Sequence, residues 1–435
     1  MPPHTRMLAL IGGIVALSFG VGVFVLPSLT PTRYETDAAR VAGASSSTAV
    51  VVEEKNMNDE REVVRHVPLP SAVKTIYMTS CVVGTPSFRK DLVDLIDRTE
   101  INSVIIDIKD YSGEISFPAQ SEILAPAWAA SKCGTSDMKA FIASLHEKDI
   151  YVIGRISVFQ DPLQTKMRPD LAVKKASDGS VWKDGKGLSF VDVSAKDHWE
   201  YILTLATDSY NIGFDELNFD YVRFPTDGNM KDIAFTHTGA KSKPEALELF
   251  FAYLHSELSK PERFASVRHE NTGRENPIPY TSADLFGMTT SNTDDLSIGQ
   301  VLERALPYFD FIAPMVYPSH YPKTFIGLAD PNSDPYKVIQ YAMSEGVRRT
   351  IASTTIVDGF KHERIGTSTP ALYSKPVYDK QKLRPWLQDF DYGGDYGPAE
   401  VRAQIQATYD TGLTSWMLWA PSNRYTEGAL ESGMQ

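Results

Sequence analysis

The sequence is poor in the residues on which several classes of site depend. Its 435 residues include 2 cysteines and 9 histidines. Two cysteines cannot build a disulfide-dense scaffold or a four-cysteine zinc site. Basic residues are also in the minority, with 43 Lys+Arg against 55 Asp+Glu. The net charge of −12 argues against a nucleic-acid partner, because such proteins need a basic face to displace counterions.

Several catalytic motifs are missing as well. No Gly-rich phosphate turn follows the first predicted strand, which also lacks histidine. His146, His198 and His255 fall on predicted helices, where we expect surface positions. Neither Cys81 nor Cys133 lies in a motif with a nearby histidine, which disfavours a cysteine nucleophile. We therefore expect no metal and no other cofactor, and a metal-dependent deacetylase is the least favoured function.

One long hydrophobic run is present, at the N-terminus. Residues Met7 to Leu29 carry no charge and, at ~1.5 Å per residue, can cross a bilayer core of ~30 Å. Arg6 favours a cytoplasmic N-terminus. We predict a single-pass cell-membrane anchor over residues 1–29, with the remainder extracytoplasmic. A cleaved signal peptide is the alternative.

The segment that follows, residues 30–72, has few aromatic residues and no persistent apolar period. Such a segment buries too little apolar surface to offset the entropy of ordering. We predict a flexible linker over residues 30–72 and a folded domain over residues 73–435.

Eight β-branched or aromatic runs recur in the folded domain, separated by amphipathic segments. The predicted strands cover residues 74–80, 101–110, 151–159, 214–224, 280–288, 309–318, 384–390 and 415–421. The predicted helices cover residues 88–99, 136–149, 198–211, 245–258 and 398–412. This α/β alternation predicts a closed parallel (β/α)8 TIM barrel, and an open doubly wound sheet is the alternative.

Polar residues at the C-terminal ends of these strands are the site candidates, because barrel active sites lie there. In the fourth strand, Leu217, Phe219 and Tyr221 alternate with Asn218 and Asp220. Side chains alternate between the two faces of a strand. We expect the apolar set to pack under the helices and the polar set to face the lumen, with Asp220 nearest the mouth.

The same alternation on neighbouring strands brings more charged groups to the lumen. It predicts that Asp107, Lys109, Arg155 and Asp284 face inward. Lys109 beside Asp107 would keep that carboxylate ionised, and the two could form an internal ion pair. The remaining candidates for substrate contact around the mouth are Tyr221, Arg223, Tyr317, His320, Trp386, Gln388 and Trp419.

Paired carboxylates suit the cleavage of a glycosidic bond, which needs one proton donor and one nucleophile or base. Asp220 and Asp284 end adjacent strands, whose axes should lie ~4.8 Å apart, and we predict them as the catalytic pair. The aromatic rings at the mouth would stack on sugar rings. Cys81 and Cys133 should also lie near the mouth, where a disulfide between them is a hypothesis.

Seven motifs together resemble one known family. They are IIDIKDYSG, GRISVFQD, GFDELNFDYVRFP, SADLFG, APMVYPSHY, RPWLQDF and WMLWAPSNRY. They resemble the putative glycosyl hydrolase domain of many bacterial proteins, over residues 74–425. The resemblance implies a TIM-barrel fold and a carbohydrate-active role.

The fourth predicted strand departs from the pattern of chitinase-type barrels at the place of the acid. Those barrels carry D-x-x-D-x-D-x-E on their fourth strand. Asp215, Asn218 and Asp220 follow that spacing here, but Val222 occupies the place of the acid.

Two functions remain open. The first is a membrane-anchored glycoside hydrolase that acts on cell-envelope or extracellular polysaccharide. The second is a non-catalytic carbohydrate-binding or scaffolding barrel. The missing acid favours the second, and the inward carboxylates favour the first, because buried polar groups cost stability unless they are satisfied.

Overall fold

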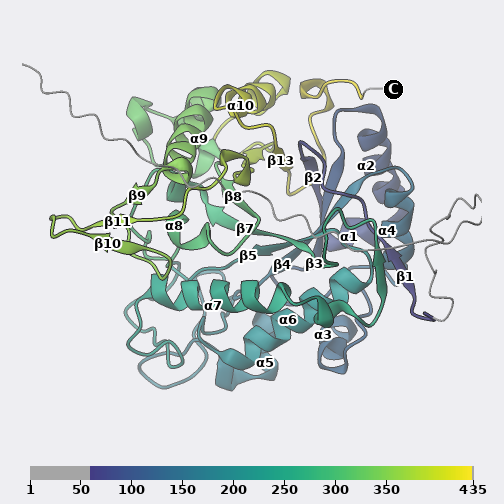
Figure 1. Cartoon of the computed structure of the whole chain (residues 1–435), viewed down its shortest axis with the longest axis horizontal. Coiled ribbons are helices and arrows are strands. Elements are labelled where there is room, and N and C mark those ends of the chain that lie inside the picture. Colours follow the sequence, from purple (N-terminus) through teal and green to yellow (C-terminus); the bar gives the residue numbers. More distant parts are fainter. Residues whose placement is uncertain (1–58, 434–435) are drawn as a thin grey trace, which may run out of the picture. The chain divides into compact units, whose positions relative to one another are not determined.

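The computed structural model describes residues 59–433. Within them, eight parallel strands close into a barrel in the order β12-β13-β2-β3-β4-β5-β7-β8 (Figure 1). The barrel strands are β2 (Lys74–Met78), β3 (Ser103–Lys109), β4 (Tyr151–Ser157), β5 (Glu216–Asp220), β7 (Tyr280–Phe286), β8 (Phe311–Met315), β12 (Trp386–Gln388) and β13 (Trp416–Trp419). Each lies inside one of the eight predicted runs, so the closed parallel barrel is confirmed and the open sheet is wrong.

Helices follow most of the barrel strands and cover the outside of the sheet (Figure 1). The longer ones are α2 (Pro86–Arg98), α4 (Met138–His146), α6 (Lys196–Asn211), α7 (Lys243–Leu258), α9 (Pro335–Ile351) and α10 (Pro398–Asp410). The short ones are α1 (Ser80–Val83), α3 (Ala125–Ala129), α5 (Pro162–Met167) and α8 (Leu302–Ala305). Sequence patterning predicted five of the six longer helices and missed α9, which packs against α10.

Strand alternation separates a lumen from a helix layer. On β3, Val104 and Ile106 pack in the large cluster under the helices. Ile105, on the opposite face, belongs to a smaller cluster in the lumen with Tyr151 and Met417. The lumen is therefore filled by side chains, and only its mouth is open to a ligand.

The N-terminal boundary of the folded part differs from the prediction. Strand β1 (Val63–Arg65) pairs in parallel with β6 (Arg268–Glu270), and the folded unit begins at Glu60. Residues 60–72 therefore belong to the barrel unit and not to the predicted linker. Sequence patterning missed this because β1 has three residues, and its order depends on contacts about two hundred positions away in the chain.

The predicted membrane anchor, residues 1–29, lies outside the described residues. Between residues 59 and 433, the structure contains no helix that is long and apolar enough to cross a membrane.

A separate antiparallel sheet lies between α9 and β12 in the chain. It consists of β9 (Thr354–Thr355), β10 (Glu363–Ile365) and β11 (Leu372–Ser374) (Figure 1). Its residues do not line the barrel mouth.

The hypothesised disulfide is present. Cys81, in α1 after β2, is bonded to Cys133, in the loop after α3, with a Cα–Cα distance of 4.4 Å. The backbone N–H of Gly134 donates to the carbonyl of Ser80 at 3.0 Å. The bond thus ties together the loops that follow the first two barrel strands.

Candidate active site

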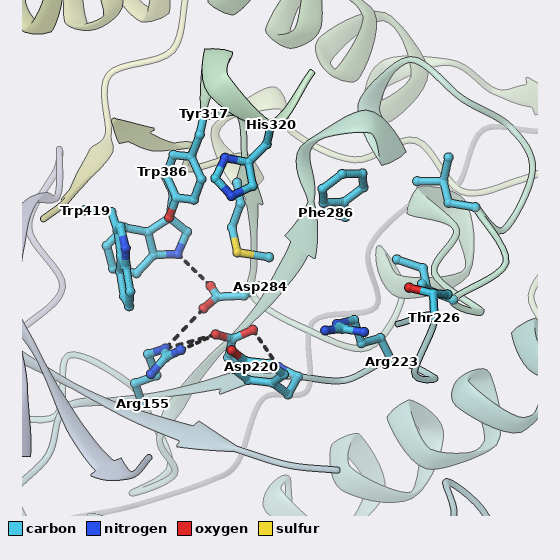
Figure 2. A pocket seen from close by; sticks show the side chains of 14 residues that line it. Arg155, Asp220, Arg223, Thr226, Asp284, Phe286, Tyr317, His320, Trp386 and Trp419 are labelled. Atoms are coloured by element: carbon cyan, nitrogen blue, oxygen red, sulfur yellow. Dashed lines mark hydrogen bonds and ion pairs between the residues drawn. The ribbon is translucent and has the colours of Figure 1, made fainter. Parts of the chain in front are cut away.

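A pocket of about 420 Å³ opens at the C-terminal mouth of the barrel (Figure 2). Its size is within the usual range for ligand sites. Nine of the predicted site residues line it: Arg155, Asp220, Tyr221, Arg223, Asp284, Tyr317, His320, Trp386 and Trp419. Figure 2 shows the two carboxylates between the group of Tyr317, Trp386 and Trp419 on one side and Arg223 and Thr226 on the other.

Asp220 is the last residue of β5 and is held in place by its neighbours. Its Oδ2 accepts hydrogen bonds from Arg155, from Nε at 3.1 Å and also from Nη2. Its Oδ1 accepts from the backbone N–H of Tyr221 at 2.5 Å. Tyr221 has a φ of 51°, an uncommon conformation for a non-glycine residue that often marks a functional site.

Asp284 lies on the neighbouring strand, β7, and is 1% exposed. Its Oδ1 accepts from Asn218 Nδ2 at 2.9 Å and from Trp386 Nε1 at 2.8 Å. Burial and the nearby Asp220 charge raise the pKa of Asp284 well above its ordinary value, although Arg155 opposes this shift. Oδ1 accepts both of these hydrogen bonds, which leaves Oδ2 as the oxygen that can carry a proton.

One guanidinium links the two carboxylates. Arg155 Nε is 3.1 Å from Asp220 Oδ2 and 3.8 Å from Asp284 Oδ2, so these two oxygens are at most about 7 Å apart. Two carboxyl groups, one of them with a raised pKa, therefore face the same pocket at short range. This arrangement can donate one proton and offer one nucleophile or base to the same bond.

Asp107 supports the site from below the pocket. Its Oδ1 accepts from Arg155 Nη1 at 2.6 Å, and its Oδ2 accepts from the hydroxyl of Tyr77. Burial raises the pKa of Asp107 to about 6, against the opposing effect of Arg155. Asp107 does not line the pocket, so it positions Arg155 rather than contacting a ligand.

The predicted ion pair between Lys109 and Asp107 is wrong. The ladder between β3 and β4 shifts register between Asp107 and Lys109, and this bulge turns Lys109 away from the site. Lys109 Nζ instead lies 2.8 Å from Asp161 Oδ2 and donates to the carbonyl of Ser157 at 2.6 Å. Simple alternation cannot anticipate a bulge.

Gln388 and Asn218 also lie behind the pocket wall. Gln388 Oε1 accepts from Ser319 Oγ at 2.8 Å and from Ser319 N at 3.2 Å, which fixes the turn that carries His320. Asn218 donates to Asp284 and to Ser282 Oγ at 3.0 Å. Both residues position other site residues.

Sequence reasoning missed several members of the site. Tyr77, on β2, bonds to Asp107 and stacks on Trp419 with ring centroids 4.1 Å apart. Tyr77 occupies a lumen position by the same strand alternation that identified Asp220. Applying that alternation to β2 would therefore have found it. Thr226 and Phe286 also line the pocket. Phe286 ends β7 on the same alternation as Asp284, so that alternation could have found it, whereas Thr226 lies in an irregular segment and leaves no periodic signal.

Two of the three helix histidines differ from the expectation of surface positions, whereas His255 is exposed on α7 as predicted. His198 is fully buried, and its Nε2 lies 2.9 Å from the carbonyl of Val158. His146 Nε2 lies 3.0 Å from Asp215 Oδ2. The helical segments are amphipathic, but these two positions lie on the faces that meet the barrel. Within residues 59–433, no three His, Cys, Asp or Glu side chains are grouped as a metal site requires.

The structure explains why the acid of the chitinase-type pattern is missing from the pocket. Val222 packs in the helix-layer cluster and is buried, so the position that holds the acid in that pattern contributes no group to the pocket. Asp215 lies outside the pocket, where His66 and His146 bond to its two oxygens at 3.1 Å and 3.0 Å.

The fold and the pocket together define a (β/α)8-barrel protein with a carboxylate-centred site at the C-terminal mouth. Residues 75–425 match the family described as "Putative glycosyl hydrolase domain". The chain belongs to this family, and the membership supports a general glycoside hydrolase role.

One solved structure shows the same architecture. The glycoside hydrolase domain of PgaB (BpsB) from Bordetella bronchiseptica is similar with a TM-score of 0.53 and 12% identity, over 83% of this chain and 99% of that domain. At this identity the likeness shows the fold alone. A hypothetical protein from Ruminiclostridium thermocellum is 34% identical over 45% of this chain and 95% of its own, with a TM-score of 0.38. No curated protein matches the chain.

Proposed function

We propose that this protein is a glycoside hydrolase that cleaves cell-envelope or extracellular polysaccharide with Asp284 and Asp220. The observation that carries the proposal is the pair of carboxylates on one guanidinium, one of them with a raised pKa. Asp284 Oδ2 would protonate the leaving oxygen as the general acid. Asp220, held by two hydrogen bonds from Arg155, would act as the nucleophile or base.

The surroundings of the pair suit a sugar. Trp386 and Trp419 are perpendicular to one another, with ring centroids 5.5 Å apart, and Tyr317 lies beside them in Figure 2. Flat apolar faces next to polar groups are what a pyranose, with its apolar faces and hydroxyl rim, requires for recognition.

The test begins with binding of the full-length protein to a glycan array, followed by measurement of reducing ends released from each bound glycan. We expect release by the wild type and a fall of at least about a hundredfold in the Asp220→Asn variant. Asp91→Asn, an exposed change on α2, is the matched control and should keep full activity.

The alternative, a carbohydrate-binding or scaffolding barrel, predicts a different outcome. Glycans would bind, no reducing ends would appear, and Asp220→Asn would leave binding unchanged. Full activity in Asp220→Asn would show that the proposed chemistry is wrong.

We also propose that the protein is anchored in the cell membrane with its barrel on the extracytoplasmic side. The proposal rests on the uncharged run Met7–Leu29. The full chain should stay with membranes after an alkaline carbonate wash, and a chain without residues 1–29 should be released. Release of the intact full chain would contradict the anchor.

A further inference from the structure

A second pocket adjoins the carboxylate pocket. It has a volume of about 400 Å³, and Tyr221, Arg223 and Thr226 line both pockets. Because the two share a wall at the surface, one extended ligand can occupy both. Asp220 and Asp284 line only the first pocket, so we assign binding and not chemistry to the second.

Gln160 is the informative residue of the second pocket. It is 4% exposed, and its backbone is fixed by a β-bridge to Phe190 and by Ser157 Oγ, which donates to its carbonyl at 3.1 Å. Between residues 59 and 433, no hydrogen bond to its side-chain amide is present. Gln160 lines the second pocket, so the donor and the acceptor of its amide are available there to a ligand.

Arg223 stands at the junction of the pockets. Its guanidinium carbon lies 5.4 Å from the ring centroid of Tyr221 and 5.8 Å from that of Phe190. Nη1 donates to the carbonyl of Phe224 at 3.2 Å, and within the described part of the chain Arg223 makes no ion pair. Its remaining N–H groups are therefore available to a ligand that passes from one pocket to the other.

The charge of the second pocket argues for a neutral ligand. Arg223 and Lys186 line it together with Asp184 and Asp227, so cations and carboxylates are equal in number. At its edge, the Tyr111 ring is 55% exposed and offers a stacking face. An amide, a guanidinium and an exposed aromatic ring are groups that recognise the hydroxyl rim and the apolar face of a neutral sugar.

We propose that the second pocket is a sugar subsite in which Gln160 and Arg223 bind hydroxyl groups, and that the protein acts on oligomeric glycan chains rather than on a single terminal sugar. This inference rests on the glycoside hydrolase function proposed above. It adds a specificity determinant that lies outside the carboxylate pocket.

The test measures binding to the full-length protein with Asp220→Asn as the background, so that no substrate is consumed. The probes are oligomers of one to six units of glucose, N-acetylglucosamine, galactose or mannose, studied by titration calorimetry. Affinity should rise at the length at which the chain reaches the second pocket. Adding Gln160→Ala should weaken binding of the longer oligomers by about five- to tenfold, as expected for one lost hydrogen bond, and leave the shortest ligands unchanged.

Two further variants complete the design. Tyr111→Ala removes an exposed ring without changing the core. It should also weaken the binding of the longer oligomers and leave the binding of the shortest ones unchanged. Gln406→Ala, exposed on α10, should change nothing. If long and short oligomers bind equally, or if Gln160→Ala and Tyr111→Ala bind long oligomers as tightly as the background does, the second subsite is wrong while the hydrolase proposal stands. If no probe binds, both proposals are contradicted.

Discussion

Arg155 binds Asp220 through two of its nitrogens and Asp107 through the third. The Nε and Nη2 groups both donate to Asp220 Oδ2, and Nη1 donates to Asp107 Oδ1 at 2.6 Å. Arg155 is 5% exposed. One buried cation therefore compensates the carboxylates at the barrel mouth and sets the distance between those that we assign to catalysis.

Removing that cation should destabilise the fold. Arg155→Met leaves buried carboxylates without compensation, which typically costs about 3–5 kcal/mol. We expect a loss of that order in the free energy of unfolding, measured by chemical denaturation. Adding Asp107→Asn should recover part of the loss, because it removes one unpaired charge. With Asp107→Asn measured alone as well, a loss in the double variant equal to the sum of the two single losses would show that Asp107 and Arg155 are not coupled.

The pKa of Asp284 should depend on Asp220. Burial is the larger cause of the raised pKa of Asp284, and repulsion from Asp220 adds to the shift. Asp220→Asn should therefore lower the pKa of Asp284. Carboxyl ¹³C NMR titration measures this directly, with Asp91→Asn as the control. The raised value also means that the folded state holds the Asp284 proton more tightly than the unfolded state does. This contribution to stability is complete below the unfolded pKa and is lost as the pH rises through the folded pKa.

The spacing of the carboxylates predicts the stereochemical outcome. The two oxygens on Arg155 Nε are at most about 7 Å apart. Retention requires about 5–5.5 Å and inversion about 6.5–9.5 Å between the carboxyl groups. The upper bound of about 7 Å excludes most of the inverting range, so it favours retention. Proton NMR of the first-formed anomer, recorded before mutarotation, will decide, and an inverted product would contradict the assignment of Asp220 as nucleophile.

His198 should make the fold sensitive to acid. Burial lowers its pKa to about 4, whereas the unfolded chain binds this proton near pH 6.5. Between these values the unfolded state holds more protons, so stability should fall as the pH falls. His198→Phe should flatten that slope in denaturation curves, while His237→Gln, at an exposed position, should not. An unchanged slope in His198→Phe would contradict the assignment.

The disulfide should contribute to stability at the mouth. Cys81 and Cys133 are 52 positions apart, and closing a loop of this length typically stabilises a protein by about 2–4 kcal/mol. We expect the Cys81→Ser/Cys133→Ser variant to unfold at lower denaturant concentration. Mass spectrometry after alkylation should show two adducts under reducing conditions and none without reductant. Adducts without reductant would show that the bond does not form.

The sequence alone was sufficient to predict the barrel. Eight β-branched runs between amphipathic helices carry the strand and helix periods directly, and the alternation of Leu217 and Phe219 with Asn218 and Asp220 specified which face is the lumen. Those are local properties, because burial on one face of a strand requires an apolar residue at every second position. The same logic placed Asp220 and Asp284 at one mouth.

Tertiary structure decided what local patterns do not encode. A bulge in β3 sends Lys109 to Asp161 and leaves Asp107 to Arg155 and Tyr77. Strand β1 is ordered by a distant partner strand, and Gln160 and Arg223, which follow different barrel strands, line one pocket. Such relations depend on which segments become neighbours in space. Sequence therefore determined the scaffold and the carboxylates, and the tertiary contacts determined their partners, protonation and the pocket beside them.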